Sequence, residues 1–228
     1  MIVAANFKMY KTRKETIEYI NELKKTDFGG VKVAVFPPQS ALIKDELIGA
    51  QNAYPEVHGA YTGEIGLEQL EEFGIKKLML GHSERRNILG ETQEFIAKKF
   101  EFYKNHGFEI FYCIGEPLEV RERGIDAVVE YLKSQFEGID LSYEKLIIAY
   151  EPVWAIGTGK SASLEEIKEV VSEIKKITTL PTIYGGSVKP NNIKDIISIE
   201  GVDGVLVGSA SLDVNNLKEM INKAKEIK

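Results

Sequence analysis

The most constraining feature of the sequence is a pattern, repeated eight times, in which a short apolar run precedes a longer segment of mixed polarity. The short runs are rich in β-branched residues and are apolar throughout, which predicts parallel strands that are buried on both faces. No linker or low-complexity segment interrupts the pattern, so we expect a single domain over residues 1–228. The eight strands that we predict are Ile2–Asn6, Val31–Phe36, Gly49–Asn52, Lys77–Leu80, Glu109–Cys113, Leu146–Tyr150, Thr182–Tyr184 and Gly204–Val207.

Three of the intervening segments predict helices: Thr12–Lys25, Ser163–Ile177 and Asp213–Lys228. Ser163, with Glu166 three residues later, has the pattern of a capping box at the start of a helix. Alternating strands and helices are typical of either an open doubly wound sheet or a closed (β/α)8 barrel. We predict the closed (β/α)8 barrel, because eight units in 228 residues come near the length of about 250 that is usual for this fold.

Composition excludes several classes of partner. The formal net charge is −6, so the chain lacks the overall basic character that is typical of a nucleic-acid-binding protein. The apolar start Met1–Ala5 is too short for a secretory signal, and no apolar run approaches the length of a membrane span. We therefore expect a soluble, cytoplasmic protein without nucleic-acid or membrane partners. We expect no disulfide and no metal, because Cys113 is the one cysteine and His58, His82 and His106 lack metal-ligand spacing.

The active site of such a barrel lies at the C-terminal ends of its strands, so the residues that follow the predicted strands carry most of the functional information. A cation, an imidazole, a carboxylate and two glycine-bearing turns would meet there on one face. The residues at these strand ends are Asn6, Lys8, His82, Glu84, Cys113, Glu151, Gly185, Gly186, Ser187, Gly208 and Ser209.

The two turns that follow the last two predicted strands, Gly185–Ser187 and Gly208–Ser209, favour phosphate binding. Many barrels bind phosphate at this position through backbone N–H groups and a helix N-terminus. One glycine turn alone would fit a tight connection equally well, but two on neighbouring strands favour an anion site. The pattern G-x-x-x-x-G-K-[ST] is absent from the sequence, so a nucleoside triphosphate is not expected.

Two side chains at strand ends, besides the carboxylate of Glu151, could act on a reacting group. Lys8 directly follows an apolar strand and could stabilise an oxyanion. His82 precedes Ser83, a candidate helix N-cap, and a helix N-terminus disfavours the imidazolium, so we expect a neutral ring. Glu84 is placed to orient Lys8. Cys113 is interpreted as a buried strand-end residue, since no histidine adjoins it in the sequence.

Seven short sequences, in order along the whole chain, resemble the triosephosphate isomerase family. The strings are "NFKMY" (6–10), "AYTGEIG" (60–66), "GHSERR" (81–86), "CIGE" (113–116), "YEPVWAIGTGK" (150–160), "YGGSV" (184–188) and "GVLVGSASL" (204–212). The sequence departs from the common family pattern at Ser209, where many members have a second glycine. It is also shorter than many members, mainly around the helices.

The resemblance implies a TIM barrel that interconverts dihydroxyacetone phosphate and D-glyceraldehyde 3-phosphate through an enediolate, without a cofactor, as a homodimer. It implies that Glu151 is the catalytic base and that His82 and Lys8 stabilise the enediolate oxygens. The other residues that it implies are Asn6 and Lys8 for substrate binding, Gly157, Ser187, Gly208 and Ser209 for phosphate, Glu84 and Cys113 as supporting residues, and Thr62 at the dimer contact, near the partner's Asn6 and Lys8.

The stretch after Glu151 has the character of a lid. Val153–Ile156 is apolar where a loop would ordinarily be polar, which suits a segment that covers a site and excludes water. Exclusion of water matters for an enediolate, because this intermediate can otherwise lose its phosphate by elimination. In this interpretation Gly157 presents its N–H group to phosphate, and Gly159 with Lys160 forms the trailing hinge.

Two other functions remain open on the residues alone. One is a different phosphate-binding barrel enzyme, either a sugar-phosphate epimerase or a Schiff-base aldolase. An epimerase would usually need metal ligands, and an aldolase needs a lysine inside a strand, whereas Lys8 follows one. The other is a binding protein without activity on the same scaffold, which the combination of Lys8, His82 and Glu151 disfavours.

Overall fold

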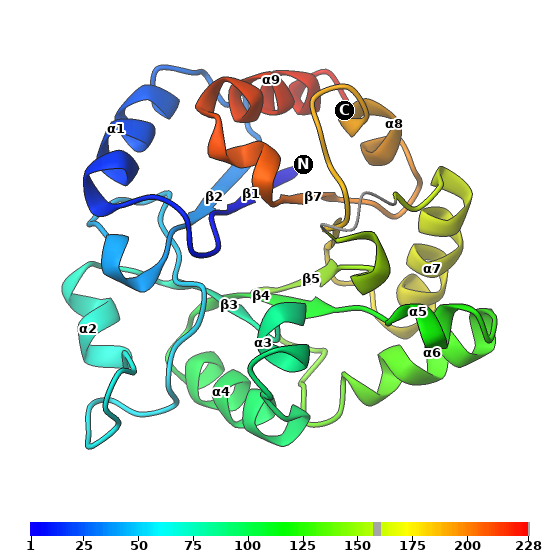
Figure 1. The fold of residues 1–228 in the computed structure, drawn as a ribbon, viewed down its shortest axis with the longest axis horizontal. Helices are drawn as coiled ribbons and strands as arrows, with labels where there is room; N and C mark the ends of the chain where they lie inside the picture. Colours follow the sequence, from blue (N-terminus) through cyan, green and yellow to red (C-terminus); the bar gives the residue numbers. More distant parts are fainter. Residues whose placement is uncertain (157–160, 228) are drawn as a thin grey trace.

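The computed structural model describes residues 1–156 and 161–227. In these ranges seven strands pair in parallel in the order β2-β1-β7-β6-β5-β4-β3. Helices lie between successive strands and surround them, which confirms the predicted TIM-barrel architecture (Figure 1). The strands are β1 (Ile2–Asn6), β2 (Lys32–Phe36), β3 (Lys77–Leu80), β4 (Glu109–Ile114), β5 (Leu146–Tyr150), β6 (Thr182–Tyr184) and β7 (Gly204–Val207).

The predicted strand Gly49–Asn52 is wrong as a strand, although this part of the chain does lie between β2 and β3. It makes two isolated parallel bridges, one from Ile48 to β2 and one from Ala50 to β3. Two bridges on opposite sides do not form a ladder. Beyond Ala50 a side chain replaces backbone pairing, because Gln51 Nε2 donates to the carbonyl of Phe36 at 2.8 Å. The seven strands therefore form a nearly closed barrel, and this segment spans the remaining gap.

The described helices include the three that the sequence predicts most clearly, each within two or three residues of its expected bounds. In α7 the capping box is present, with Glu166 N–H donating to Ser163 Oγ at 3.2 Å and Ser163 N–H donating to Glu166 Oε2 at 2.8 Å. The helices are α1 (Arg13–Leu23), α2 (Leu67–Glu72), α3 (Ser83–Asn87), α4 (Gln93–Asn105), α5 (Leu118–Arg121), α6 (Ile125–Ser134), α7 (Leu164–Ile177), α8 (Ile193–Ile197) and α9 (Val214–Lys225). None of them is long and apolar enough to cross a membrane.

The strands are buried on both faces, which explains why they are apolar throughout. One set of side chains fills the barrel interior, where the rings of Phe36 and Phe111 meet edge to face with 5.0 Å between centroids. The alternate set, which includes Val3 and Tyr112, packs outward under the helices. A filled interior closes the barrel to ligands, so a site must lie at the strand ends.

Candidate active site

One cavity of about 600 Å³ opens at the C-terminal ends of the strands. The side chains that the sequence predicts for the site converge on it from β1, β3, β5, β6 and β7. Predicted site residues among its lining are Asn6, Lys8, His82, Glu84, Glu151, Ser187, Gly208 and Ser209.

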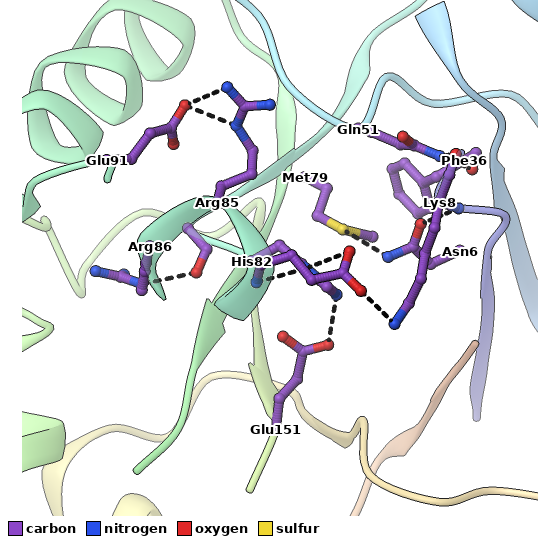
Figure 2. A network of polar contacts seen from close by, with 12 residues as sticks. Asn6, Lys8, Phe36, Gln51, Met79, His82, Arg85, Arg86, Glu91 and Glu151 are labelled. Atoms are coloured by element: carbon purple, nitrogen blue, oxygen red, sulfur yellow. Dashed lines mark hydrogen bonds and ion pairs between the residues drawn. The ribbon is translucent and has the colours of Figure 1, made fainter. Parts of the chain in front are cut away.

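Glu151 follows β5 and is held by close backbone packing on two sides. A Cβ atom on Gly115 would lie 1.7 Å from the carbonyl oxygen of Glu151, and one on Gly185 would lie 2.7 Å from its Cγ. Glycine at these two positions leaves the room that Glu151 occupies. Its Oε1 atom lies 3.2 Å from His82 Nε2 (Figure 2), whereas its buried Oε2 has no hydrogen-bond partner among the described residues.

His82 follows β3 and is itself the N-cap of α3, one residue before the cap that the sequence suggests. The N–H group of Glu84 donates to His82 Nδ1 at 3.2 Å. The Nδ1 lone pair is therefore in use, so a neutral ring carries its proton on Nε2 and can donate it toward Glu151.

The charge of His82 depends on Glu151. Burial lowers the pKa of His82, whereas the Glu151 carboxylate beside the ring raises it, and the pKa lies above its ordinary value. This direction is opposite to the one expected from the helix N-terminus. The physical reason is a carboxylate in direct contact with the ring, which a reading of neighbours in the sequence does not reveal.

Lys8 follows β1 in a conformation that is unusual for a side-chain-bearing residue, with φ of 50°. Such a conformation costs about 1–2 kcal/mol, and two side chains hold it in place. Asn6 Oδ1 accepts from the N–H group of Lys8 at 2.9 Å, and Gln51 Nε2 donates to its carbonyl at 2.8 Å. The Lys8 ammonium pairs with Glu84 Oε1 at 2.7 Å, and both residues line the cavity.

The turns after β6 and β7 contribute part of the cavity wall. Ser187 and Gly208 line it, and Asn192 Nδ2 donates to the carbonyl of Ser187 at 2.9 Å. Ser209 begins a short 3-10 helix, Ser209–Leu212, and does not adopt a positive φ. Serine at this position therefore introduces no backbone strain.

Two of the predicted site residues lie elsewhere, and a third falls outside the described residues. Cys113 belongs to the barrel interior beneath the cavity, where burial and the nearby Glu151 raise its pKa well above the ordinary value, so it stays a thiol. Thr62 lies in an exposed loop, and Gly157 lies outside the described residues, together with the proposed hinge residues Gly159 and Lys160.

The described part of the predicted lid is tied to a buried acid. Val153–Ala155 forms a short 3-10 helix, and Ala155 and Ile156 line the cavity. Trp154 Nε1 donates to Glu116 Oε1 at 2.9 Å. Burial raises the pKa of Glu116. Sequence reasoning assigned no role to Glu116 or Gln51, because their contacts come from distant parts of the chain. It also missed Asn192, although this residue contacts Ser187 only five positions earlier.

Comparison with known proteins decides the family. The sequence model described as Triosephosphate isomerase matches residues 1–224. The chain belongs to the triosephosphate isomerase family. A triosephosphate isomerase of a Nitratiruptor species is 56% identical over 235 residues and is covered in full, as is this chain.

Two further members of the triosephosphate isomerase family are similarly close. One from a Sulfurovum species is 59% identical over 227 residues, covering 97% of this chain and 99% of its own length. One from Sulfurimonas denitrificans is 52% identical over 233 residues, covering 100% of this chain and 97% of its own length. The family match therefore extends over the whole barrel and includes every strand end that faces the cavity.

Proposed function

We propose that this chain is an isomerase that interconverts dihydroxyacetone phosphate and D-glyceraldehyde 3-phosphate by proton transfer through an enediolate. The observation that carries the proposal is the contact of 3.2 Å between Glu151 Oε1 and His82 Nε2 at the cavity wall. A carboxylate base and a ring N–H donor so close together can act on adjacent atoms of one small substrate. The family membership supports the same reaction.

In this mechanism Glu151 removes a proton from the carbon next to the substrate carbonyl and returns it to the neighbouring carbon, while the hydroxyl proton of the substrate passes to the former carbonyl oxygen. The charge then develops on two oxygen atoms, and His82 Nε2–H and the Lys8 ammonium stabilise it. Such a contact is typically worth about 10²–10³ in rate. The pairing of Lys8 with Glu84 keeps the ammonium oriented before the substrate arrives.

His82 acts as a neutral donor in the complex. A substrate carbonyl oxygen takes the place of Glu151 Oε1 as the acceptor of the Nε2 proton, so the carboxylate no longer stabilises an imidazolium. The N–H group of Glu84 continues to occupy Nδ1. Protonation of Nδ1 would lose that hydrogen bond, which favours the neutral ring.

The phosphate group binds at the other end of the cavity, to backbone N–H groups of the turns at Ser187 and Gly208–Ser209. Gly157, which lies outside the described residues, is the further N–H donor that the family resemblance implies. The apolar side chains of Ala155 and Ile156 already line the cavity, which suits a cover that excludes water from the enediolate.

We further propose that the chain acts as a homodimer in the cytoplasm. Residues 57–64 are exposed throughout and belong to the cyan loop before α2, which projects from the ring of helices (Figure 1). Tyr61 packs on Tyr54 with 4.0 Å between ring centroids yet stays 40% exposed, more apolar surface than a solvated loop needs. Docking of this loop would bring Thr62 to the partner's Asn6 and Lys8.

A coupled assay on the purified chain, run in both directions with the two triose phosphates, tests the proposed function. We expect turnover without added metal or cofactor. A folded chain without turnover would contradict it and favour a binding protein. An aldolase would instead form an imine that borohydride traps. The ion pair between Lys8 and Glu84 disfavours this outcome, because an imine-forming amine must be uncharged.

A further inference from the structure

A buried network outside the cavity begins at Gln135, the residue that follows α6. Its side-chain amide pairs with both polar groups of one glycine. The N–H group of Gly115 donates to Gln135 Oε1 at 2.9 Å, and Gln135 Nε2 donates to the carbonyl of Gly115 at 3.3 Å. An amide that satisfies both backbone groups fixes the orientation of the two peptide units that flank Gly115, as a neighbouring strand would.

Gly115 in turn determines where the backbone of Glu151 can lie. Its Cα is so close to the Glu151 carbonyl that an added Cβ would fall 1.7 Å from the oxygen and 2.6 Å from the carbon. The residue before Gly115 adds a direct link, because the Ile114 carbonyl accepts from Glu151 N–H at 2.7 Å. A shift of the Gly115 peptide would therefore move Glu151.

The same network also reaches the backbone next to His82. Tyr112 donates its hydroxyl proton to the carbonyl of Gln135, and Arg86 Nη2 donates to the Tyr112 hydroxyl at 3.0 Å. Arg86 Nε donates to the carbonyl of Gly81, directly before His82, at 2.6 Å. Gly81 has φ of 74°, and a Cβ there would lie 2.6 Å from Arg86 Nη2, so glycine makes room for the guanidinium.

None of these side chains lies in the lining of the cavity. Figure 2 shows Arg86 on the side of His82 away from Lys8, with its guanidinium directed away from Glu151. Tyr112 belongs to the outward-facing layer, stacked on Phe136 with 6.3 Å between centroids. Gln135 is itself 6% exposed. Direct contact with a substrate is therefore not their role.

We propose that Gln135, supported by Tyr112 and Arg86, is a positioning residue that holds Glu151 in register with His82 for proton transfer. This inference rests on the proposed function and deepens it. Proton abstraction needs the carboxylate at a defined distance from carbon, and a displacement of about 1 Å can cost about 10² in rate. The phosphate end of the cavity comes from other strands, β6 and β7, so it should keep its geometry when this network is broken.

The test is Gln135→Met, which keeps the volume of the side chain and removes both hydrogen bonds to Gly115. We expect kcat to fall about 10-fold to 10²-fold, while the Ki of inorganic phosphate as a competitive inhibitor stays within about twofold, since its site is not touched. A substitution that acted only through lost packing would lower thermal stability. It would not lower kcat while leaving the Ki of inorganic phosphate unchanged. A folded Gln135→Met variant with unchanged kcat, or with kcat and phosphate binding lost together, overturns the proposal.

Tyr112→Phe provides the second variant, with Tyr143→Phe as its matched control. Tyr143 also donates its hydroxyl to a backbone carbonyl, that of Phe108 at 2.6 Å, but at the N-terminal end of β4. We expect Tyr112→Phe to lower kcat while phosphate binding is retained, and Tyr143→Phe to leave kcat unchanged. If Gln135→Met does not fold, this comparison of the two tyrosine variants tests the proposal in its place. Equal losses in the two tyrosine variants overturn the proposal. No turnover in the unaltered chain would contradict the proposed function itself.

Discussion

The Nε2 atom of His82 lies 3.2 Å from the Oε1 atom of Glu151, and the two side chains are only 6% and 4% exposed. They come from strand ends separated by β4 and meet above the barrel interior. A pair so well buried is costly to desolvate, which makes it weak evidence for stability and better evidence for a site. The surrounding glycines and the Nδ1 contact of His82 orient the pair toward the cavity.

Glu151→Gln should abolish isomerisation while the barrel stays folded. An amide cannot accept a proton from carbon, so we expect kcat to fall by at least about 10². At a pH where His82 is neutral, stability should change little, because a neutral ring gains no charge stabilisation from Glu151 and Oε2 lacks a hydrogen-bond partner among the described residues. Turnover by coupled assay and thermal unfolding measure the two effects. Glu109→Gln, at the opposite end of β4 beside Lys32, is the control and should keep full activity. Near-normal turnover in Glu151→Gln would exclude Glu151 as the base.

The pKa of His82 should fall when the carboxylate beside it is removed. In the unaltered chain the carboxylate of Glu151 opposes the effect of burial and raises this pKa above its ordinary value. In Glu151→Gln burial prevails, so an NMR titration of the ring should give a lower pKa. Because the pKa of His82 is higher in the folded chain than in the unfolded chain, the protonated ring stabilises the fold. This contribution is complete at a pH below the pKa of the unfolded chain, and it is lost as the pH rises through the pKa of the folded chain. An equal or higher pKa in the variant would contradict this account.

Gly185→Ala should act on catalysis through Glu151. The new Cβ would lie 2.7 Å from Glu151 Cγ, so the carboxylate must shift while the fold can adapt. We expect kcat to fall about 10-fold to 10²-fold. The residual rate of Glu151→Gln should not fall further when Gly185→Ala is added, because the effect of the alanine passes through the carboxylate. Additive losses would show that the glycine acts by another route.

Ser209 should contribute its backbone more than its hydroxyl. Ser209→Gly keeps the N–H group at the start of the short helix, so the Ki of inorganic phosphate should stay within severalfold. Ser209→Pro removes that donor and should weaken phosphate binding severely. The KM of the substrate should follow the same order. A large loss in the glycine variant would show instead that the hydroxyl holds the anion.

Tyr61→Asp should convert the proposed dimer into monomers with little activity. A charge on the exposed loop would be buried without a partner at the interface, which is costly. Sedimentation velocity and the coupled assay measure both consequences. Leu164→Asp is a matched control, because Leu164 is 41% exposed against 40% for Tyr61 but lies at the start of α7. A fully active monomer would refute the role of the loop.

The amino-acid sequence by itself determined most of the fold and the chemistry of the candidate site. The short apolar runs of the strands and the capping box at Ser163 are each encoded within a few neighbouring residues. They could therefore be predicted without knowing what packs against them. The positions of Glu151 and His82 directly after apolar strands, with glycine turns after the last two strands, were enough to suggest where a site lies and what chemistry it supports.

Only the tertiary structure decided which groups touch. Packing of the strands and helices brings Gln135 to Gly115 and Gln51 to Lys8, and it places the Glu151 carboxylate against His82, which reverses the expected direction of the pKa shift. It also leaves residues 48–50 with two bridges instead of the predicted strand. Hydrogen-bond partners and desolvation depend on atoms that are far apart in the chain and adjacent in space. Periodicity, which reports only on neighbours along the chain, carries no information about them.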